Sequence, residues 1–300
     1  MACGTRSPRP SLAPIAVAGL VCAVGAGACG NVNAALEHLV EARQHAADLR
    51  VDFTTANDAS NRAVMADTDE ASIASAHEAE QAMTAVQRDI DALRPLLQGL
   101  GYTDETGLLG QFAARFKDYE DVERRILDLA VENSNLKAER LSFGAGADAA
   151  EAFKGALDRI DAATPPDERW HVRALTADAV ANLRAIQVLE APHIAASDDA
   201  VMAQLETRMK AAETAVRSDL AALAALRPSS RQAIGDATTA LNGFMDVHAQ
   251  ILVLSHQNTN VRSLAMALKD KPAVVADCDA RLRDLTDALA KRGYRTGWWR

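Results

Sequence analysis

Aromatic residues are scarce in this sequence: Phe, Trp and Tyr together make up 4% of its 300 residues. A folded core must therefore be built from aliphatic side chains, and Ala and Leu are the dominant ones. Runs of β-branched residues are nearly absent, while the polar stretches are rich in Glu, Gln, Arg and Asp. Most of these residue types favour helix, so the composition predicts an all-α protein. The 16 glycines and 9 prolines are too few for a disordered chain.

Cysteine is rare as well, with 4 in the chain. Cys3 and Cys22 fall in an N-terminal segment of unusual composition, which leaves Cys29 and Cys278 for the remainder. Two cysteines cannot form the framework of a disulfide-rich exported domain. We expect Cys278 to be a small buried apolar residue on the last helix.

Signatures of enzymes and of bound cofactors are missing from the sequence. It contains no Cys-x-x-Cys-His for covalent haem, no Walker-type glycine loop and no Gly-x-Ser-x-Gly around a nucleophile. We therefore expect a protein that is not an enzyme and that has no cofactor.

Residues 1–29 resemble an export signal. Arg6 and Arg9 precede an apolar run, and no acidic residue lies in this segment. The run is shorter than the roughly 20 apolar residues of a membrane-spanning helix and ends in small residues. Its last four residues, "AGAC", resemble a lipobox, although Ala26 stands where a leucine is usual. Two outcomes remain open, lipidation of Cys29 and ordinary cleavage nearby, and both predict an exported protein that is either periplasmic or a membrane-anchored lipoprotein.

Acidic residues outnumber basic ones by 41 to 32, which gives a net charge of −9. A nucleic-acid-binding protein normally concentrates Lys and Arg on one face, so we expect no nucleic-acid partner. The exception is the basic aromatic tail 294–300, which contains Trp298 and Trp299. This tail is interpreted either as a frayed terminus or as a contact with a membrane surface.

Turn signals divide the rest of the chain into eight predicted helices. The two prolines of "TPPDE" (164–168) fit the first turn of a new helix better than a helix interior, so we place a boundary there. "GAG" (144–146) is interpreted as a helix-ending turn. The predicted helices span about 33–66, 67–97, 107–143, 144–163, 168–190, 201–226, 230–268 and 272–292.

One pattern occurs twice. "YEDVERRILDLAVENSN" (119–135) aligns without a gap on "FMDVHAQILVLSHQNTN" (244–260) at an offset of 125 residues. In each copy, apolar residues spaced by alternating threes and fours form one seam of a helix. Asn133 and Asn258 occupy the same position on that seam. A polar residue there tends to fix helix register, so we predict buried register-setting groups, with ligand contact as the alternative.

The two seams continue in the same spacing to Phe143 and Leu268. Asn135 and Asn260 lie two residues beyond the seam asparagines and cannot share their face of the helix. We expect these two side chains to bond a neighbouring helix or water.

A second, weaker match at an offset of 122 residues pairs Arg62 with Arg184. Together the two matches predict an internal duplication. The fold expected from it consists of two tandem up-down four-helix-bundle units, residues 30–164 and 165–293.

"ILVLSHQNTNVRSLAMAL" (251–268), followed by a final helix with "CDARLRDLTDAL" (278–289), resembles the four-helix-bundle sensory domain of bacterial methyl-accepting chemotaxis receptors. The likeness is stronger over 167–292 than over 33–163. It implies an extracytoplasmic bundle that binds a small molecule or a partner protein, often as a homodimer. The sequence shows no second transmembrane segment and no cytoplasmic signalling part after the last helix, so we expect signalling to depend on a partner.

Histidines and acidic residues at metal-ligand spacing are interpreted as polar side chains that face solvent. His38, Glu41 and His45 share one helix face but lack a fourth ligand. Glu168-x-x-His171 and Glu190-x-x-His193 would lie roughly 33 Å apart on one helix, too far to share a metal pair. His248 and His256 are interpreted as single polar residues. We therefore assign no metal ligands. A third class of protein, a metalloprotein, would require His38, Glu41 and His45 to meet a ligand from another helix.

These features predict a sensory or ligand-binding module of chemoreceptor type, in which binding between helices or at a dimer seam shifts helix packing. The candidate ligand-binding residues are Arg62, Arg184, Asn133 and Asn258, because each recurs in both halves. The alternative is a structural or protein-interaction bundle without a small-molecule site. A pocket lined by converging polar groups would favour the binding module, and a dry seam whose polar groups only pair helices would favour the scaffold.

Overall fold

The computed structural model describes residues 25–292, of which 92% are helical, as the composition predicts. The segment 1–24, the side chain of Cys29 and the tail 294–300 lie outside this description, so the export signal, the lipidation and the tail contact stay predictions. The elements are α1 (Gly25–Val64), α2 (Asp69–Gly99), α3 (Thr103–Glu132), α4 (Ser134–Leu141), the π-helical turn η1 (Ser142–Gly146), α5 (Ala147–Ala162), α6 (Arg169–Ala195), α7 (Asp199–Leu226), the short 3-10 turn η2 (Pro228–Ser230), α8 (Arg231–Gln257), α9 (Thr259–Lys269) and α10 (Lys271–Lys291).

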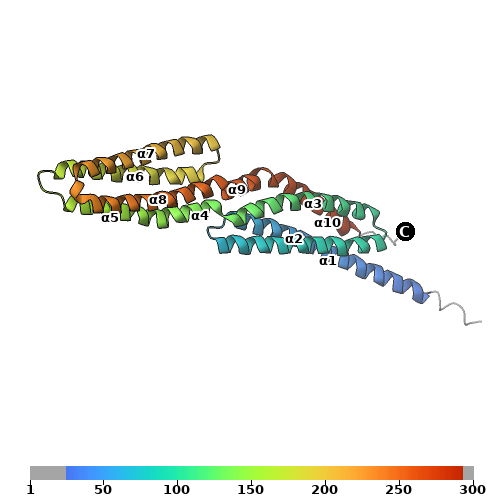
Figure 1. Ribbon diagram of the computed structural model, residues 1–300. Coiled ribbons are helices and arrows are strands. Elements are labelled where there is room, and N and C mark those ends of the chain that lie inside the picture. Colours follow the sequence, from blue (N-terminus) through green and yellow to red (C-terminus); the bar gives the residue numbers. More distant parts are fainter. Residues whose placement is uncertain (1–24, 293–300) are drawn as a thin grey trace, which may run out of the picture.

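Several helices continue one another across breaks. Taking α3–α5 and α8–α9 each as one broken helix, seven helices pack side by side in the described part of the chain. The two broken helices lie along the length of an elongated molecule and run in opposite directions, with α1 and α2 near one end and α6 and α7 near the other (Figure 1). Between residues 25 and 292, no helix has the length and apolar content that a membrane crossing needs.

Side-chain caps mark where α2 and α7 begin. The Thr68 hydroxyl accepts a hydrogen bond from the backbone N–H of Ala71 at 3.1 Å and caps α2. Asp198 caps α7 in the same way, with its carboxylate 2.7 Å from the backbone nitrogen of Ala200. Between α2 and α3 the chain reverses at Gly101, whose φ of 70° suits a residue without a Cβ.

The helices share two large hydrophobic cores. The first is formed by α1, α2, α3 and α10, and the second by α5, α6, α7 and α8. Much of the scarce aromatic content lies in the first core. There the Phe53 ring meets Phe112 and Tyr119 edge-on, with ring centroids 6.1 Å and 5.0 Å away. Cys278 is fully buried in the same core, as predicted, and burial raises the pKa of its thiol to about 12.

These cores cut across the predicted 30–164 and 165–293 units. Helix α10 belongs to the second predicted unit but packs with α1–α3, while α5 belongs to the first and packs with α6–α8. The cause lies at "GAG" (144–146), which was interpreted as a helix-ending turn. The chain passes through it as a π-helical turn and continues into α5 without reversing. The broken helix α3–α5 therefore contributes to both large cores, whereas α8–α9 contributes α8 to the second.

The absence of a side chain at Gly146 suits the π-helical turn. A Cβ at Gly146 would lie 3.1 Å from the carbonyl oxygen of Leu141 and within 4 Å of Val247 and Ile251 on α8. The short distance is to the turn's own backbone, so the glycine lets the π-helical turn form without crowding the Leu141 carbonyl, while the α8 side chains lie at ordinary packing distance.

The two copies of the repeated pattern meet where the cores join. We call residues 133–135 and 258–260 the asparagine junction. The backbone N–H of Ser134 donates to the Thr259 hydroxyl at 3.0 Å, and the N–H of Thr259 donates to the Ser134 hydroxyl at the same distance. The N–H groups of Asn135 and Asn260 each donate to the other's side-chain oxygen at 3.1 Å. The first backbone donors of α4 and α9, which have no partner within their own helices, are thus capped reciprocally.

The seam asparagines are buried, as predicted, but they do not continue a helix. Asn133 and Asn258 adopt the left-handed conformation, with φ of 50° and 53°. Because each break rotates the face that follows it, Phe143 and Leu268 are exposed, although the seam spacing predicted them on the buried side. Asn135 and Asn260 join the same junction through their side chains, since Asn135 Nδ2 donates to Asn258 Oδ1 at 2.9 Å and Asn260 Nδ2 to Asn133 Oδ1 at 2.8 Å.

Candidate functional site

The four predicted ligand-binding residues do not come together. Arg62 is exposed on α1 and pairs with Glu78 at 2.6 Å. Arg184 is exposed on α6 and pairs with Glu151. Asn133 and Asn258 are buried in the asparagine junction and bond to other protein groups. A ligand role for these four residues stays a prediction.

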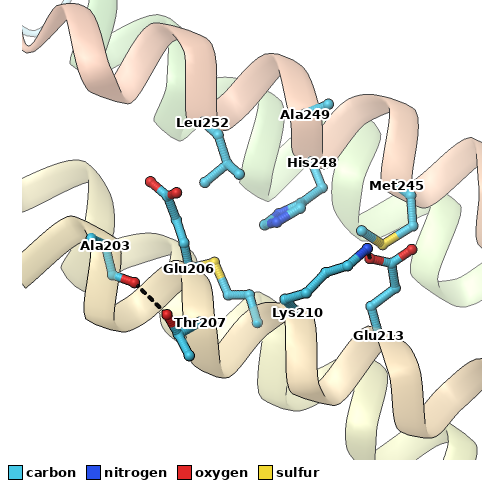
Figure 2. Close-up of a pocket in the computed structure, with 10 residues that line it drawn as sticks. Ala203, Glu206, Thr207, Lys210, Glu213, Met245, His248, Ala249 and Leu252 are labelled. Atoms are coloured by element: carbon cyan, nitrogen blue, oxygen red, sulfur yellow. Dashed lines mark hydrogen bonds and ion pairs between the residues drawn. The ribbon is translucent and has the colours of Figure 1, made fainter.

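A groove between α7 and α8 has a cavity volume of about 680 Å³ (Figure 2). Met209, Met245 and Leu252 supply apolar lining, and polar groups extend into the same space. Its largest polar residues are Glu206, Lys210, Glu213 and His248. An apolar groove with a few convergent polar groups is the usual form of a small-molecule site.

The carboxylates of the groove differ in whether Lys or Arg side chains neutralise their charge. Lys210 and Arg217 both donate to the carboxylate of Glu213, at 2.8 Å and 2.9 Å. Partial burial raises the pKa of Glu213, but these two hydrogen bonds outweigh it and lower the pKa overall. Two cations therefore neutralise Glu213, whereas Glu206 has no Lys or Arg partner among the described side chains.

A buried polar chain lies behind the groove wall. Glu190 on α6 is fully buried; its Oε1 lies 2.9 Å from Nδ1 of His248, and its Oε2 accepts a hydrogen bond from the Ser142 hydroxyl at 2.5 Å. The sequence interpretation placed Glu190 and His248 on exposed faces, and the structure corrects this. Their partners come from other helices, so a helical pattern read along one chain segment cannot find them.

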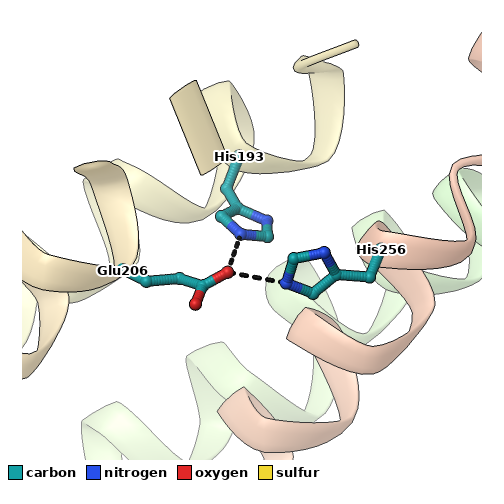
Figure 3. A group of neighbouring side chains, drawn as sticks. All are labelled: His193, Glu206 and His256. Carbon is teal, nitrogen blue, oxygen red and sulfur yellow. Dashed lines mark hydrogen bonds and ion pairs between the residues drawn. The ribbon is translucent and has the colours of Figure 1, made fainter. Parts of the chain in front are cut away.

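Beside the groove, His193, Glu206 and His256 gather from three helices (Figure 3). His193 Nε2 lies 2.9 Å and His256 Nε2 lies 2.7 Å from the same oxygen, Oε1 of Glu206. The bond with His193 lowers the pKa of Glu206, His256 adds to the effect, and partial burial opposes it. His193 is completely buried, again contrary to the exposed position expected from sequence.

A second buried ionic cluster lies in the first core. Lys271, at the start of α10, places its Nζ 2.7 Å from Oε1 of Glu123 on α3. The same ammonium group donates to Ser60 at 2.9 Å and to Asn61 at 3.0 Å, both on α1. Burial lowers the pKa of Lys271, and the neighbouring Glu123 carboxylate opposes this effect. The cluster ties three helices together, because Lys271 of α10 is bonded both to Glu123 of α3 and to Ser60 and Asn61 of α1.

His38, Glu41 and His45, which were interpreted from the sequence as exposed polar residues of the first helix, have separate surroundings. His45 Nδ1 lies 3.0 Å from Asp89 of α2, whereas His38 and Glu41 remain exposed. Among residues 25–292, His193, Glu206 and His256 are the group whose ligand atoms come close enough to share a metal ion. Comparison with known protein families and with characterised proteins found no match to this chain.

Proposed function

We propose that this chain is an extracytoplasmic sensory module of chemoreceptor type that binds a small molecule in the groove between α7 and α8. The groove is the observation on which the proposal rests. Its apolar walls and convergent polar groups are expected of a binding module and not of a scaffold. The sequence resemblance to chemoreceptor sensory domains supports the same reading.

The lining favours a ligand with an apolar body and a hydrogen-bond-donating or positively charged group. Met209 and Met245 provide flexible, polarizable surface that adapts to an apolar ligand. Glu206 is the carboxylate available to accept from a ligand donor. Lys210 is mostly exposed at the rim, where it can meet an acidic substituent of an amino-acid-like ligand.

The contacts also supply a route by which binding alters helix packing. Asn135 Nδ2 donates to the carbonyl of Ile194 at 2.6 Å, and Asn258 Nδ2 donates to the carbonyl of Ala196 at 2.8 Å. Both carbonyls lie at the C-terminal end of α6, close in sequence to His193. A ligand that moves α7 against α8 therefore acts on α8, which leads into the asparagine junction, and on α6, which is bonded to the junction and reaches α7 through the His193–Glu206 contact.

The duplication is part of the same proposal. Two four-helix units, descended from one ancestral unit, would each supply one copy of the repeated pattern to the junction. The reciprocal bonds at an offset of 125 residues support this origin. In this proposal the protein is exported and anchored by a lipid at Cys29. It forms a homodimer and relays binding to a signalling partner.

Ligand-dependent thermal unfolding of the purified chain tests the groove. The panel contains amino acids, aliphatic amines and organic acids, with a chelator present to keep metal ions out. A ligand at a hundred times its Kd stabilises the folded chain by about 2.7 kcal/mol. We expect a shift that disappears in Met245→Trp, which fills the groove.

Met83→Trp is the matched control, because Met83 is also half-buried and lines a shallow pocket in the first core. It should fold and keep the shift. A shift that survives Met245→Trp would place the ligand elsewhere. If no compound in the panel shifts the melting temperature, the structural or protein-interaction bundle becomes the better reading, and the asparagine junction would then serve only to pair helices.

A further inference from the structure

The hydrogen bonds between His193 and Ser255 determine which ring nitrogen of His193 carries a hydrogen. The Ser255 hydroxyl lies 3.0 Å from the carbonyl oxygen of His193 and 2.7 Å from its Nδ1. A carbonyl oxygen can only accept, so the single hydroxyl hydrogen goes to the carbonyl. Nδ1 must then carry a hydrogen and donate it to Ser255.

This assignment fixes the other side of the ring. A neutral histidine that carries its hydrogen on Nδ1 has a bare lone pair on Nε2. That lone pair faces Oε1 of Glu206 at 2.9 Å. Two lone pairs repel each other at this distance unless a positive charge lies between them. The occupant is either a proton or a metal ion.

His256 strengthens the case for a metal ion. Its Nε2 lies 2.7 Å from the same Glu206 oxygen, and the donor atoms of all three residues lie within 4.8 Å of one another. The His193 and His256 rings stand nearly perpendicular, at 86°. Two imidazole nitrogens and a carboxylate oxygen are a common ligand set for Zn²⁺. We propose that His193, Glu206 and His256 bind one divalent transition-metal ion of the Zn²⁺ class.

The spacing requires only a small adjustment. Tetrahedral Zn²⁺ with bonds of about 2.0–2.1 Å holds neighbouring ligand atoms about 3.3 Å apart. The two imidazole nitrogens, now 2.9 Å and 2.7 Å from the Glu206 oxygen, must each move away from it by about half an ångström to reach that spacing. Glu206 and His256 have the freedom to move, because 35% and 48% of their side-chain surface is exposed. The buried His193 supplies the fixed point, and its Ser255 contact orients the ring as outer partners of metal-bound histidines do.

Charge and exposure define the class of ion. Among the described side chains, Glu206 pairs with His193 and His256 and with no Lys or Arg. The site therefore has one negative charge and two neutral nitrogens, which suits Zn²⁺, Cu²⁺, Ni²⁺ or Co²⁺ better than Mg²⁺ or Ca²⁺. The partly exposed side leaves a fourth position for water. The ion would join the end of α6, the start of α7 and the end of α8 next to the asparagine junction.

Zinc titration of the chelator-treated full chain, followed by calorimetry, tests this site directly. We expect one equivalent of Zn²⁺ to bind, and Co²⁺ in its place to give the absorption spectrum of a low-coordinate site. His256→Gln and Glu206→Gln should each weaken zinc binding at least tenfold while leaving the helical circular dichroism unchanged. Both side chains lie partly in solvent, so their replacement should not prevent folding.

His77→Gln is the control, since His77 is an exposed histidine that lies beside an acidic residue on α2. It should bind zinc as the wild type does. Absence of stoichiometric binding would overturn the proposal and leave a proton between His193 and Glu206. Equal zinc affinity in wild type, His256→Gln and Glu206→Gln would also overturn it. The zinc titration contains no organic ligand, so its failure is separate from failure of the groove proposal.

Discussion

At the scale of single residues, Asn133 and Asn258 combine two tasks that few residue types can perform together. Each adopts a positive φ, and each side-chain oxygen accepts a hydrogen bond from the other copy of the pattern. Asparagine tolerates the left-handed conformation better than most residues and has an amide for bonding. The physical requirement is the same on both sides of the junction, which explains why the same residue recurs.

The backbone task can be separated from the side-chain task at Asn133. Asn133→Ala and Asn133→Gly lose the same hydrogen bond, but only glycine adopts a φ of 50° without strain. We expect the glycine variant to be more stable than the alanine variant by about 1 kcal/mol, as measured by urea unfolding. At the exposed position Asp121 within α3, alanine should instead be the more stable by about 1 kcal/mol. The same order at both positions would contradict the left-handed assignment.

The residue scale also shows where sequence reasoning fails. Glu190, His193 and His248 were interpreted as solvent-exposed, yet all three are buried. Each finds its partner on another helix, at separations of 48 to 62 residues along the chain. No periodic pattern within one helix contains that information.

At the scale of the elements, α10 is held by an ion pair as well as by apolar packing. Lys271 at its first turn bonds to Glu123 on α3, and Arg292 just beyond its last residue bonds to Glu105 on α3 at 2.6 Å. The two pairs fix both ends of α10 against the same helix. The hydrogen bond from Arg292 is also the main cause of the lowered pKa of Glu105.

Replacement of Lys271 alone should lower the free energy of unfolding strongly. Lys271→Met leaves Glu123 as an uncompensated buried charge, and such losses amount to about 3–5 kcal/mol of unfolding free energy. The double variant Glu123→Gln, Lys271→Met removes both charges and keeps an acceptor for the Ser60 hydroxyl. We expect it to be more stable than Lys271→Met alone in urea unfolding. An additive result, in which the double variant is the least stable, would refute the coupling.

The exposed pair Lys154–Asp158 on α5 provides the comparison. Lys154→Met should change stability little, because water solvates the remaining carboxylate. The contrast between the two lysines tests burial as the reason for the effect.

At the scale of the whole molecule, the asparagine junction is where two hydrophobic cores become one structure. The broken helices α3–α5 and α8–α9 meet at the junction side by side (Figure 1). Their backbone donors at the break are satisfied by each other's side chains rather than by water. We therefore expect the two cores to unfold together.

Removal of the reciprocal caps should allow the two cores to unfold at different urea concentrations. In Asn135→Ala, Asn260→Ala, buried N–H groups lose their acceptors, at about 1–3 kcal/mol each. Hydrogen exchange measured by mass spectrometry across a urea series should show α2 and α7 losing protection at different urea concentrations. In the wild type the two helices should lose it together.

Asn182→Ala, Asn242→Ala is the control, because both asparagines bond a neighbouring helix at the surface of the helices that form the second core, away from the junction. It should keep a single transition. Coincident loss of protection in the Asn135→Ala, Asn260→Ala variant would mean that apolar packing alone couples the cores.

Much of the secondary structure follows from local patterns. The helices predicted at 67–97 and 201–226 correspond to α2 (Asp69–Gly99) and α7 (Asp199–Leu226), whose boundaries are set by capping residues. The helix predicted at 230–268 exists too, but it breaks at Asn258 into α8 and α9. Its apolar spacing continues through the break and so does not reveal it.

The sequence by itself determined that this protein is helical, where most helices begin and end, and that residues near 133 and 258 have equivalent roles. Only the tertiary structure decided which helices share a core, that "GAG" continues a helix, and that three polar residues from α6, α7 and α8 meet beside a groove. The reason is physical. Helix formation depends on hydrogen bonds and side chains within a few residues, whereas the choice of packing partner depends on which apolar faces fit together across the whole chain.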